Sequence, residues 1–215
     1  MGVGETVRRR LGRLEGPAAE AYRSVFINLD DLAETLASLG PAERILEIGC
    51  GDGSVADRLC AVYPQAHYLG IDVASEPGRR FTGDRSRARF RSILSSELRA
   101  ERPEPFDLVV VVDVLHHVLD GDRAGLVADA AALTRPGGVV VIKDWERDRS
   151  VAHMLCYGAD RYVSGDATVR FMPADELRTL VRAGLDGFEP LIEARVPPRR
   201  NNMLLALRRP ANGTA

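Results

Sequence analysis

The sequence predicts an α/β fold: a doubly wound, mostly parallel sheet of seven strands that ends in an antiparallel hairpin. Short apolar runs typical of strands alternate with segments of helical periodicity over most of the chain, which favours a parallel sheet with helices on both faces. The run 107–112 is almost continuously β-branched, as expected for a central strand buried on both faces. Two final apolar runs flank a Pro- and Asn-rich segment and can pair as a hairpin.

The elements of the first half follow from apolar spacing and from the residues that break it. Apolar side chains recur at helical spacing up to Leu39, and Gly40-Pro41 ends that helix. Pro64 ends the next helix, and the arginine-dense stretch 75–88 has weak helical character. The predicted elements are a helix over 22–39, a strand over 44–48, a helix over 54–63, and strands over 67–73 and 89–93.

The second half repeats the alternation and then changes direction. Pro136-Gly137-Gly138 predicts a turn before a buried strand, and Pro173 suits the first turn of a helix. The predicted elements are a strand over 107–112, a helix over 122–134, a strand over 139–143, a helix over 173–183, and strands over 188–196 and 203–207.

Composition narrows the function classes. The 215 residues suit one domain, and 29 basic residues against 31 acidic ones do not favour a large nucleic-acid groove. No apolar run is long enough for a membrane span, and no secretory signal follows the arginines near the N-terminus. Three scattered cysteines indicate a reducing, cytoplasmic setting. Lys143 is the single lysine among 28 arginines.

The first predicted strand runs into a glycine loop, Gly49-Cys50-Gly51-Asp52-Gly53, preceded by Glu47. The spacing is G-x-G-x-G and not the G-x-G-x-x-G of dinucleotide sites, and a carboxylate nearby disfavours a pyrophosphate. It tolerates a ligand that carries an amino group and a sulfonium charge. Asp72 closes the second strand 19 residues beyond Gly53, which suits a carboxylate that accepts the hydroxyls of a ribose.

The chain resembles the class I S-adenosylmethionine-dependent methyltransferases in four ordered blocks over about 44–143. They read ILEIGCGDG, YLGIDVA, FDLVVVVDVLHHV and LTRPGGVVVIKD. A lone glycine loop is a weak signal, but four blocks in the right order are specific. The resemblance implies a Rossmann-like methyltransferase fold, S-adenosyl-L-methionine as cofactor and S-adenosyl-L-homocysteine as product. It also implies methyl transfer to an oxygen or nitrogen of a small-molecule acceptor, with a specialised metabolite as one class of acceptor.

The resemblance also assigns cofactor-binding residues. It implies that Glu47 orients the loop, that the loop lies against the methionine moiety, and that Asp72 binds the ribose. It places the adenine near the ends of the second and third strands, and Asp113 at the methionine end. The complete set is Glu47, Gly49, Cys50, Gly51, Asp72, Val73, Ser92, Ile93 and Asp113.

Two histidines follow Asp113 where the family directs the methyl group. Methyl transfer mainly requires alignment of acceptor and methyl, and imidazole suits removal of an acceptor proton near neutral pH. We expect His117 to be the base, with His116 and Asp144 in support. Lys143 precedes Asp144 at the end of the fifth strand, where it either structures the pocket floor or pairs with a surface acid.

The acceptor side is expected in a long segment after the fifth strand and in the N-terminal helix. The single domain 1–215 then divides into a helical segment (1–40), a cofactor-binding core (41–144), a substrate lid (145–173), and a last helix and hairpin (174–209). The expected substrate contacts are Tyr22, Arg23, Trp145, His153, Tyr157 and Arg161.

Other classes remain open from the sequence. Catechol-type metal-dependent enzymes need an Asp-Asn pair that is absent after Asp144, so no metal is predicted. The Asn- or Asp-Pro-Pro-Tyr run of amino-methylating nucleic-acid and protein enzymes is also absent, and an RNA or protein methyltransferase stays an alternative. The arginines of 79–91 either form a solvated face or dock RNA or an acidic carrier. A non-methylating binding protein, cyclase-like or regulatory, is the second class, and a nicotinamide oxidoreductase is the third. The oligomeric state is not predicted.

Overall fold

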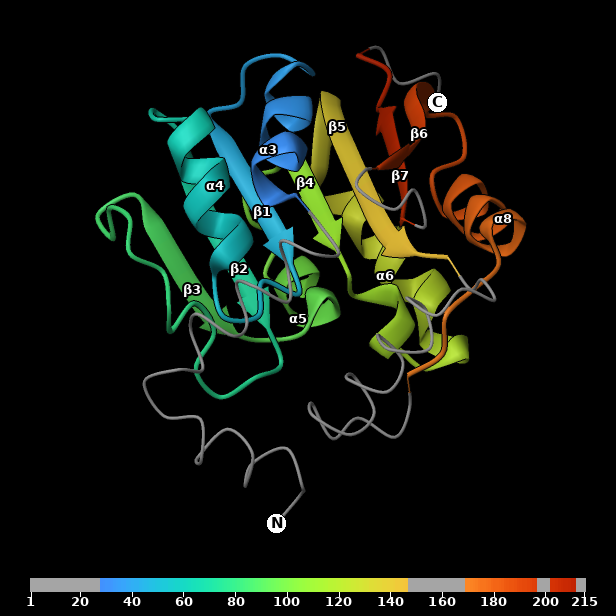
Figure 1. Cartoon of the computed structure of the whole chain (residues 1–215), viewed down its shortest axis with the longest axis horizontal. Coiled ribbons are helices and arrows are strands. Elements are labelled where there is room, and N and C mark those ends of the chain that lie inside the picture. The colour runs from blue at the N-terminus through green and yellow to red at the C-terminus, as the bar shows by residue number, and fades with distance from the viewer. Residues whose placement is uncertain (1–27, 147–168, 197–201, 212–215) are drawn as a thin grey trace.

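A computed structural model describes residues 28–146, 169–196 and 202–211, and it confirms the predicted fold class (Figure 1). One seven-stranded sheet has the strand order β3-β2-β1-β4-β5-β7-β6. The adjacent pairs among β1 to β5 are parallel, whereas β7 runs antiparallel to both β5 and β6. The strands are β1 (Arg44–Ile48), β2 (His67–Asp72), β3 (Ala88–Ser92), β4 (Phe106–Val112), β5 (Thr134–Trp145), β6 (Glu189–Val196) and β7 (Asn202–Arg208).

Helices cover both faces of this sheet. One apolar core joins the sheet to α3 and α4, and the other joins it to α5, α6 and α8. The two cores divide each central strand by the period of two, so that Val110 and Val112 of β4 face one layer while Val109 and Val111 face the other. The described helices are α3 (Leu29–Ala37), α4 (Ser54–Val62), α5 (Ser95–Ala100), α6 (Asp120–Leu133) and α8 (Ala174–Gly184), with a 3-10 turn η2 (Leu115–His117).

Most predicted elements are present at nearly the predicted bounds. Of the helix expected over 22–39, the described part begins at Leu29, where the Asn28 side chain caps it by accepting from the backbone N–H groups of Asp30 and Asp31. The terminal hairpin forms as predicted. Among the described residues, no helix is long and apolar enough to cross a membrane.

Three local expectations differ from the structure. The stretch 75–88 is bends and turns leading into β3, and the short helix α5 has no counterpart in the prediction. The predicted turn at 136–138 lies inside β5, because the pairing with β4 jumps from Phe106↔Thr134 to Leu108↔Val139. Gly137 has a φ of +78°, and a Cβ on Gly138 would lie 2.9 Å from the Asp107 carbonyl oxygen. The glycines therefore make a bulge within one strand.

The arginine-dense stretch also contributes internal contacts. Arg87 pairs with Asp84 at 3.2 Å, and Arg91 pairs with Glu101 at 2.7 Å. The Arg85 guanidinium lies 5.7 Å from the centre of the Phe90 ring. These contacts favour the interpretation of this stretch as a solvated face whose charges are paired within the chain.

Candidate active site

The glycine loop is pressed between β2 and the turn that follows β4. Gly49 has a φ of +79°, and a Cβ there would lie 2.3 Å from a Val114 side-chain carbon. The N–H groups of Gly49 and Cys50 both donate to the Ile71 carbonyl, at 2.7 and 3.0 Å. Only glycine fits this close approach at a positive φ. Burial raises the pKa of the Cys50 thiol, so that side chain stays neutral.

Asp72 connects the loop to the end of β2. Its Oδ2 accepts from the Gly51 N–H at 2.8 Å, and its Oδ1 accepts from the Ala74 N–H at 2.8 Å. Both oxygens keep further lone pairs, so the carboxylate can still accept hydroxyl groups. Val73, directly beside it, is 73% exposed.

The predicted adenine residues lie next to Asp72. Ser92 pairs in register with Asp72, and the Ile93 N–H donates to the Asp72 carbonyl at 3.0 Å. Leu94 is also exposed here, and the sequence analysis did not single it out. Two exposed apolar side chains, Val73 and Leu94, therefore adjoin a carboxylate at one edge of the sheet, which is a suitable surface for a flat heterocycle.

Glu47 lies beneath the loop. Its side chain is buried on β1, and the Tyr68 hydroxyl donates to its Oε2. Burial raises the pKa of Glu47 to about 8, and the neighbouring Asp72 and Asp52 add to this effect, although the hydrogen bond from Tyr68 lowers it. The carboxyl group is therefore mostly protonated at neutral pH.

An ion pair between the buried Lys143 and the partly buried Asp113 closes β4 and β5. Asp113 has a φ of +56°, an uncommon conformation for a residue other than glycine, and its N–H donates to the Lys143 carbonyl at 2.9 Å. Its Oδ1 lies 2.6 Å from Lys143 Nζ, and the Lys143 side chain is 0% exposed. The ammonium also lies 5.3 Å from the centre of the Trp145 ring. Lys143 thus faces inward, and Trp145 is buried beside it.

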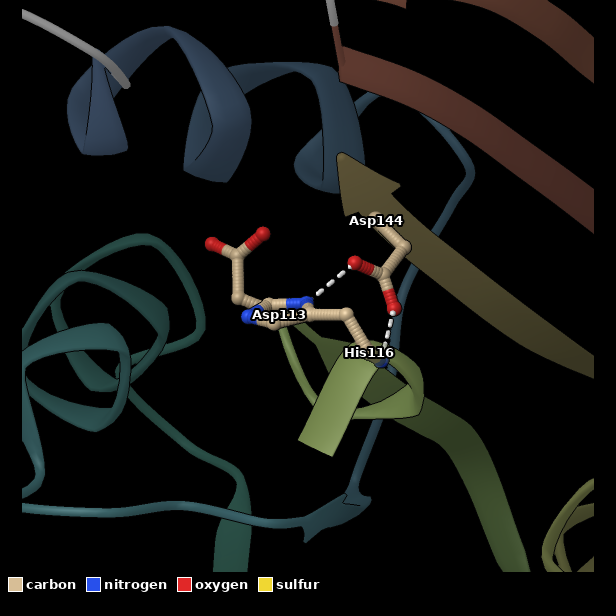
Figure 2. A group of neighbouring side chains, drawn as sticks. All are labelled: Asp113, His116 and Asp144. Atoms are coloured by element: carbon tan, nitrogen blue, oxygen red, sulfur yellow. Dashed lines mark hydrogen bonds and ion pairs between the residues drawn. The ribbon is translucent and has the colours of Figure 1, made fainter. Parts of the chain in front are cut away.

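The Asp144 side chain lies on the face of β5 opposite to that of Lys143, where it contacts His116 (Figure 2). His116 Nδ1 lies 2.5 Å from Asp144 Oδ1, and the His116 N–H donates to Asp144 Oδ2 at 3.1 Å. Burial alone would raise the pKa of Asp144, but the charge and hydrogen bond of His116, with smaller contributions from Trp145 and Lys143, hold it below its usual value. Because an ionised carboxylate only accepts, the shared proton belongs to Nδ1.

His117 occupies a different environment. Its ring is half-buried and lies 4.1 Å from the His116 ring, centre to centre, at an angle of 43°. Phe171 packs on His116 at 4.8 Å with an angle of 26°. We expected His117 to be the base with His116 and Asp144 in support, and the structure pairs the Asp144 carboxylate with His116.

Three side chains at the ends of β4 and β5 also lie close enough together for a metal site. Asp113, His116 and Asp144 each offer a ligand atom, and these atoms lie within 4.8 Å of one another. Lys143 already forms an ion pair with Asp113, and Nδ1 of His116 already donates its proton to Asp144. A divalent ion would compete with both, so these donors do not fit a resident metal as they stand. The predicted metal-free site remains a prediction.

Of the six expected substrate contacts, the structure describes one, Trp145. The others, Tyr22, Arg23, His153, Tyr157 and Arg161, lie outside the described residues. Three contributors were missed by the sequence analysis: Tyr68, Phe171 and Arg123. Tyr68 begins the block YLGIDVA, but the sequence does not show its contact with Glu47. The same holds for the contacts of Phe171 with His116 and of Arg123 with the Leu115 carbonyl, because each joins residues at least eight positions apart.

Comparisons with known proteins identify the family of this chain. A methyltransferase domain family matches residues 19–188. Two relatives are named ubiquinone biosynthesis O-methyltransferase. The one from Aeromonas salmonicida is 28% identical over 73% of this chain and 65% of its own length. The one from Xylella fastidiosa is 28% identical over 92% of this chain and 81% of its own. The chain thus spans less than two thirds of the first relative.

Solved structures share the fold at low identity. A Burkholderia thailandensis 1,6-didemethyltoxoflavin-N1-methyltransferase with bound 1,6-didemethyltoxoflavin and S-adenosylhomocysteine has a TM-score of 0.65 at 20% identity, covering 97% of this chain and 88% of that one. The [4+2]-cyclase SpnF has a TM-score of 0.64 at 19% identity, covering 85% and 81%. Because the family match covers well over half of its residues, the chain belongs to the class I S-adenosylmethionine-dependent methyltransferases.

Proposed function

We propose that this protein transfers a methyl group from S-adenosyl-L-methionine to a hydroxyl oxygen of a small-molecule acceptor, with His116 as the base and Asp144 as its partner. The observation that carries this proposal is the buried contact of 2.5 Å between His116 Nδ1 and Asp144 Oδ1 at the carboxyl ends of β4 and β5. When bound, the cofactor supplies an electrophilic methyl group on a sulfonium, which is a good leaving group.

The residues around the glycine loop suit that cofactor. Asp72 can accept the ribose hydroxyls, while Val73, Ser92 and Ile93 border the adenine and Gly49 to Gly51 admit the methionine chain. Glu47 and Asp113 supply carboxyl groups toward the amino end of the methionine. Neighbours with bound S-adenosylhomocysteine support this assignment.

The chain's own contribution to the reaction is alignment and proton removal. Asp144 holds the Nδ1 proton of His116. In the neutral imidazole Nε2 then carries the lone pair and takes the acceptor proton as the oxygen–carbon bond forms and the carbon–sulfur bond breaks. Phe171 and His117 flank the ring and limit its rotation. A hydroxyl acceptor needs such a base more than a neutral amine does, and the relatives named O-methyltransferases support the same choice.

A second reading is a cofactor-binding protein that does not methylate. The likeness to a [4+2]-cyclase is the observation that favours it, although the shared fold by itself does not specify a reaction. Methyl transfer to nitrogen is a variant of the first proposal, supported by the N1-methyltransferase neighbour. We also propose that the acceptor is small and that the protein works in the cytoplasm.

Labelled methyl transfer tests the proposal. The protein is incubated with S-adenosylmethionine labelled in the methyl group and with phenol, catechol, 4-hydroxybenzoate or aniline as acceptor probes. We expect label on at least one hydroxyl compound and thermal stabilisation by S-adenosylhomocysteine but not by NAD. Label on aniline alone would move the proposal to nitrogen. Stabilisation by S-adenosylhomocysteine without transfer to any probe would favour the non-methylating reading.

A further inference from the structure

Arg123 lies behind the turn that carries the two histidines. It belongs to the first turn of α6, and its side chain is 3% exposed. A guanidinium this deeply buried needs polar partners. Its Nε donates to the carbonyls of Leu115 and Val118, at 2.9 and 3.0 Å. These two carbonyls flank His116 and His117, so one donor group holds the first residue of η2 and the residue that follows it.

The same guanidinium reaches the chain on the other side of His116. Its Nη2 donates to the Arg170 carbonyl at 2.8 Å, and the Arg170 N–H donates to the His116 carbonyl at 2.8 Å. Phe171, the next residue, stacks on the His116 ring. Arg123 therefore determines the position of the backbone that carries the imidazole and of the ring that packs against it.

Asp120 completes this arrangement from the surface. Its Oδ1 lies 3.0 Å from Nη1 of Arg123, and its Oδ2 pairs with Arg170. Asp120 thus compensates the charge of the buried guanidinium. Asp144 is not needed for this and remains hydrogen-bonded to His116. A buried cation that contacted Asp144 directly would instead compete with the imidazole.

The opposite end of α6 offers a matched arginine. Arg209 Nη1 donates to the carbonyls of Thr134 and Ala131, at 2.6 and 3.4 Å, and so clamps the end of α6 to the start of β5. Both arginines bind helix-flanking carbonyls. Arg209 does so at the amino end of β5, and within the described part of the chain its hydrogen bonds reach neither histidine nor the segment 169–172.

We propose that Arg123 is a positioning residue for the reaction, which holds the His116 imidazole in register with Asp144. The inference rests on the proposed function, since it assigns Arg123 to the base of that reaction. A lysine at position 123 keeps the charge but cannot place donors at both the Nε and Nη2 positions, because its single ammonium lies at the end of a flexible stem. The proposal therefore depends on the fixed geometry of the Nε and Nη2 donors of Arg123 and not on its charge.

The test compares Arg123→Met and Arg123→Lys with Arg209→Met in the full chain. Nitrogen-15 NMR of labelled histidines reports the Nδ1 proton of His116, and His116→Gln assigns the signal. We expect a hydrogen-bonded Nδ1 proton in the parent protein and in Arg209→Met, and its loss or displacement in both Arg123 variants. With catechol or another probe that accepts label, kcat of the Arg123 variants should fall between about tenfold and about 10²-fold. Affinity for S-adenosylhomocysteine should change by less than about twofold, because the lost contact acts on the base.

The proposal is overturned if Arg123→Met keeps both the parental His116 signal and the parental kcat, or if Arg209→Met alters them equally. Should Arg123→Met fail to fold, Arg123→Lys carries the same comparison, because it retains the aliphatic stem and the charge. If the Arg123 variants shift the signal while His116→Gln leaves turnover unchanged, Arg123 positions the ring as proposed and the assignment of His116 as base is wrong. The NMR result therefore separates this inference from the proposed function.

Discussion

The charged residues at the amino ends of the central strands differ in burial from those at the carboxyl ends. At the amino end, Asp107 accepts from the backbone N–H groups of Glu43 and Arg44 and pairs with Arg135, whose side chain is half exposed. At the carboxyl end, Lys143 and Asp144 are at most 1% exposed. Half-exposed ion pairs contribute little to stability, whereas buried charges are costly unless they are well paired. Costly buried charges at the carboxyl end support the proposal that the reaction takes place there.

The largest effect is expected where a buried charge loses its partner. Lys143→Met leaves Asp113 partly buried without its ammonium, and we expect a loss of about 3–5 kcal/mol of unfolding free energy. Denaturant titration measures it. In Lys143→Met combined with Asp113→Asn, part of that loss should be regained, because the uncompensated carboxylate is gone. A loss below about 1 kcal/mol in the single variant would contradict the contrast between the two ends.

Lys143→Arg tests the lone lysine separately. The longer, planar guanidinium has to fit a fully buried position between Asp113 and Trp145. We expect reduced stability and weaker S-adenosylhomocysteine binding. Unchanged values of both would show that the lysine is replaceable and does not structure the pocket floor.

Site features that follow from neighbouring residues could be predicted from the sequence, whereas those that depend on contacts between distant segments could not. Strand ends place Asp72, Asp113 and Asp144 at one edge, because the carboxyl ends of parallel strands meet there. The period of two could also have shown that Lys143 and Asp144 face opposite sides of β5. The sequence could not show that Asp144 pairs with His116, because that pairing depends on the 3-10 turn and on Arg123 and Phe171, which reach the turn from other segments.

The glycine bulge in β5 shows a second limit. Pro136-Gly137-Gly138 has the composition of a turn, and composition alone cannot show that the strand continues on both sides of it. The continuation depends on tertiary pairing: the Gly137 N–H donates to the Arg209 carbonyl at 2.9 Å. Tertiary contacts therefore override the local signal here.

The pH dependence of stability gives a further prediction, for Glu47 beneath the glycine loop. The pKa of Glu47 rises from 4.5 to about 8 on folding, so the folded state holds a proton that the unfolded state releases. Its contribution to stability is fully present below pH 4.5 and is lost as the pH rises toward 8. We expect a loss of at most about 5 kcal/mol across this window.

Glu47→Gln is the control for this titration, because an amide cannot ionise. Urea titrations of both proteins between pH 5 and pH 8 should show a steeper decline in the parent than in the variant. Parallel curves would mean that Glu47 is already ionised in the folded protein at pH 5.

The smallest effect is expected at the amino end. Arg135→Met removes the ion-pair partner of Asp107. The Asp107 carboxylate still accepts hydrogen bonds from the backbone N–H groups of Glu43 and Arg44. We expect a loss of at most about 1 kcal/mol and no change in methyl transfer. A larger loss on denaturant titration would show that the ends of the strands are not as different as their burial indicates.

The central claim is that His116, and not His117, removes the acceptor proton. The most direct measurement is the single-turnover rate of labelled methyl transfer to a hydroxyl probe by the parent protein, His116→Gln and His117→Gln, each saturated with cofactor. Loss of a general base should lower the rate of His116→Gln by about 10²- to 10⁴-fold, with a much smaller decrease for His117→Gln. The reverse order, or equal rates in all three proteins, would contradict the account.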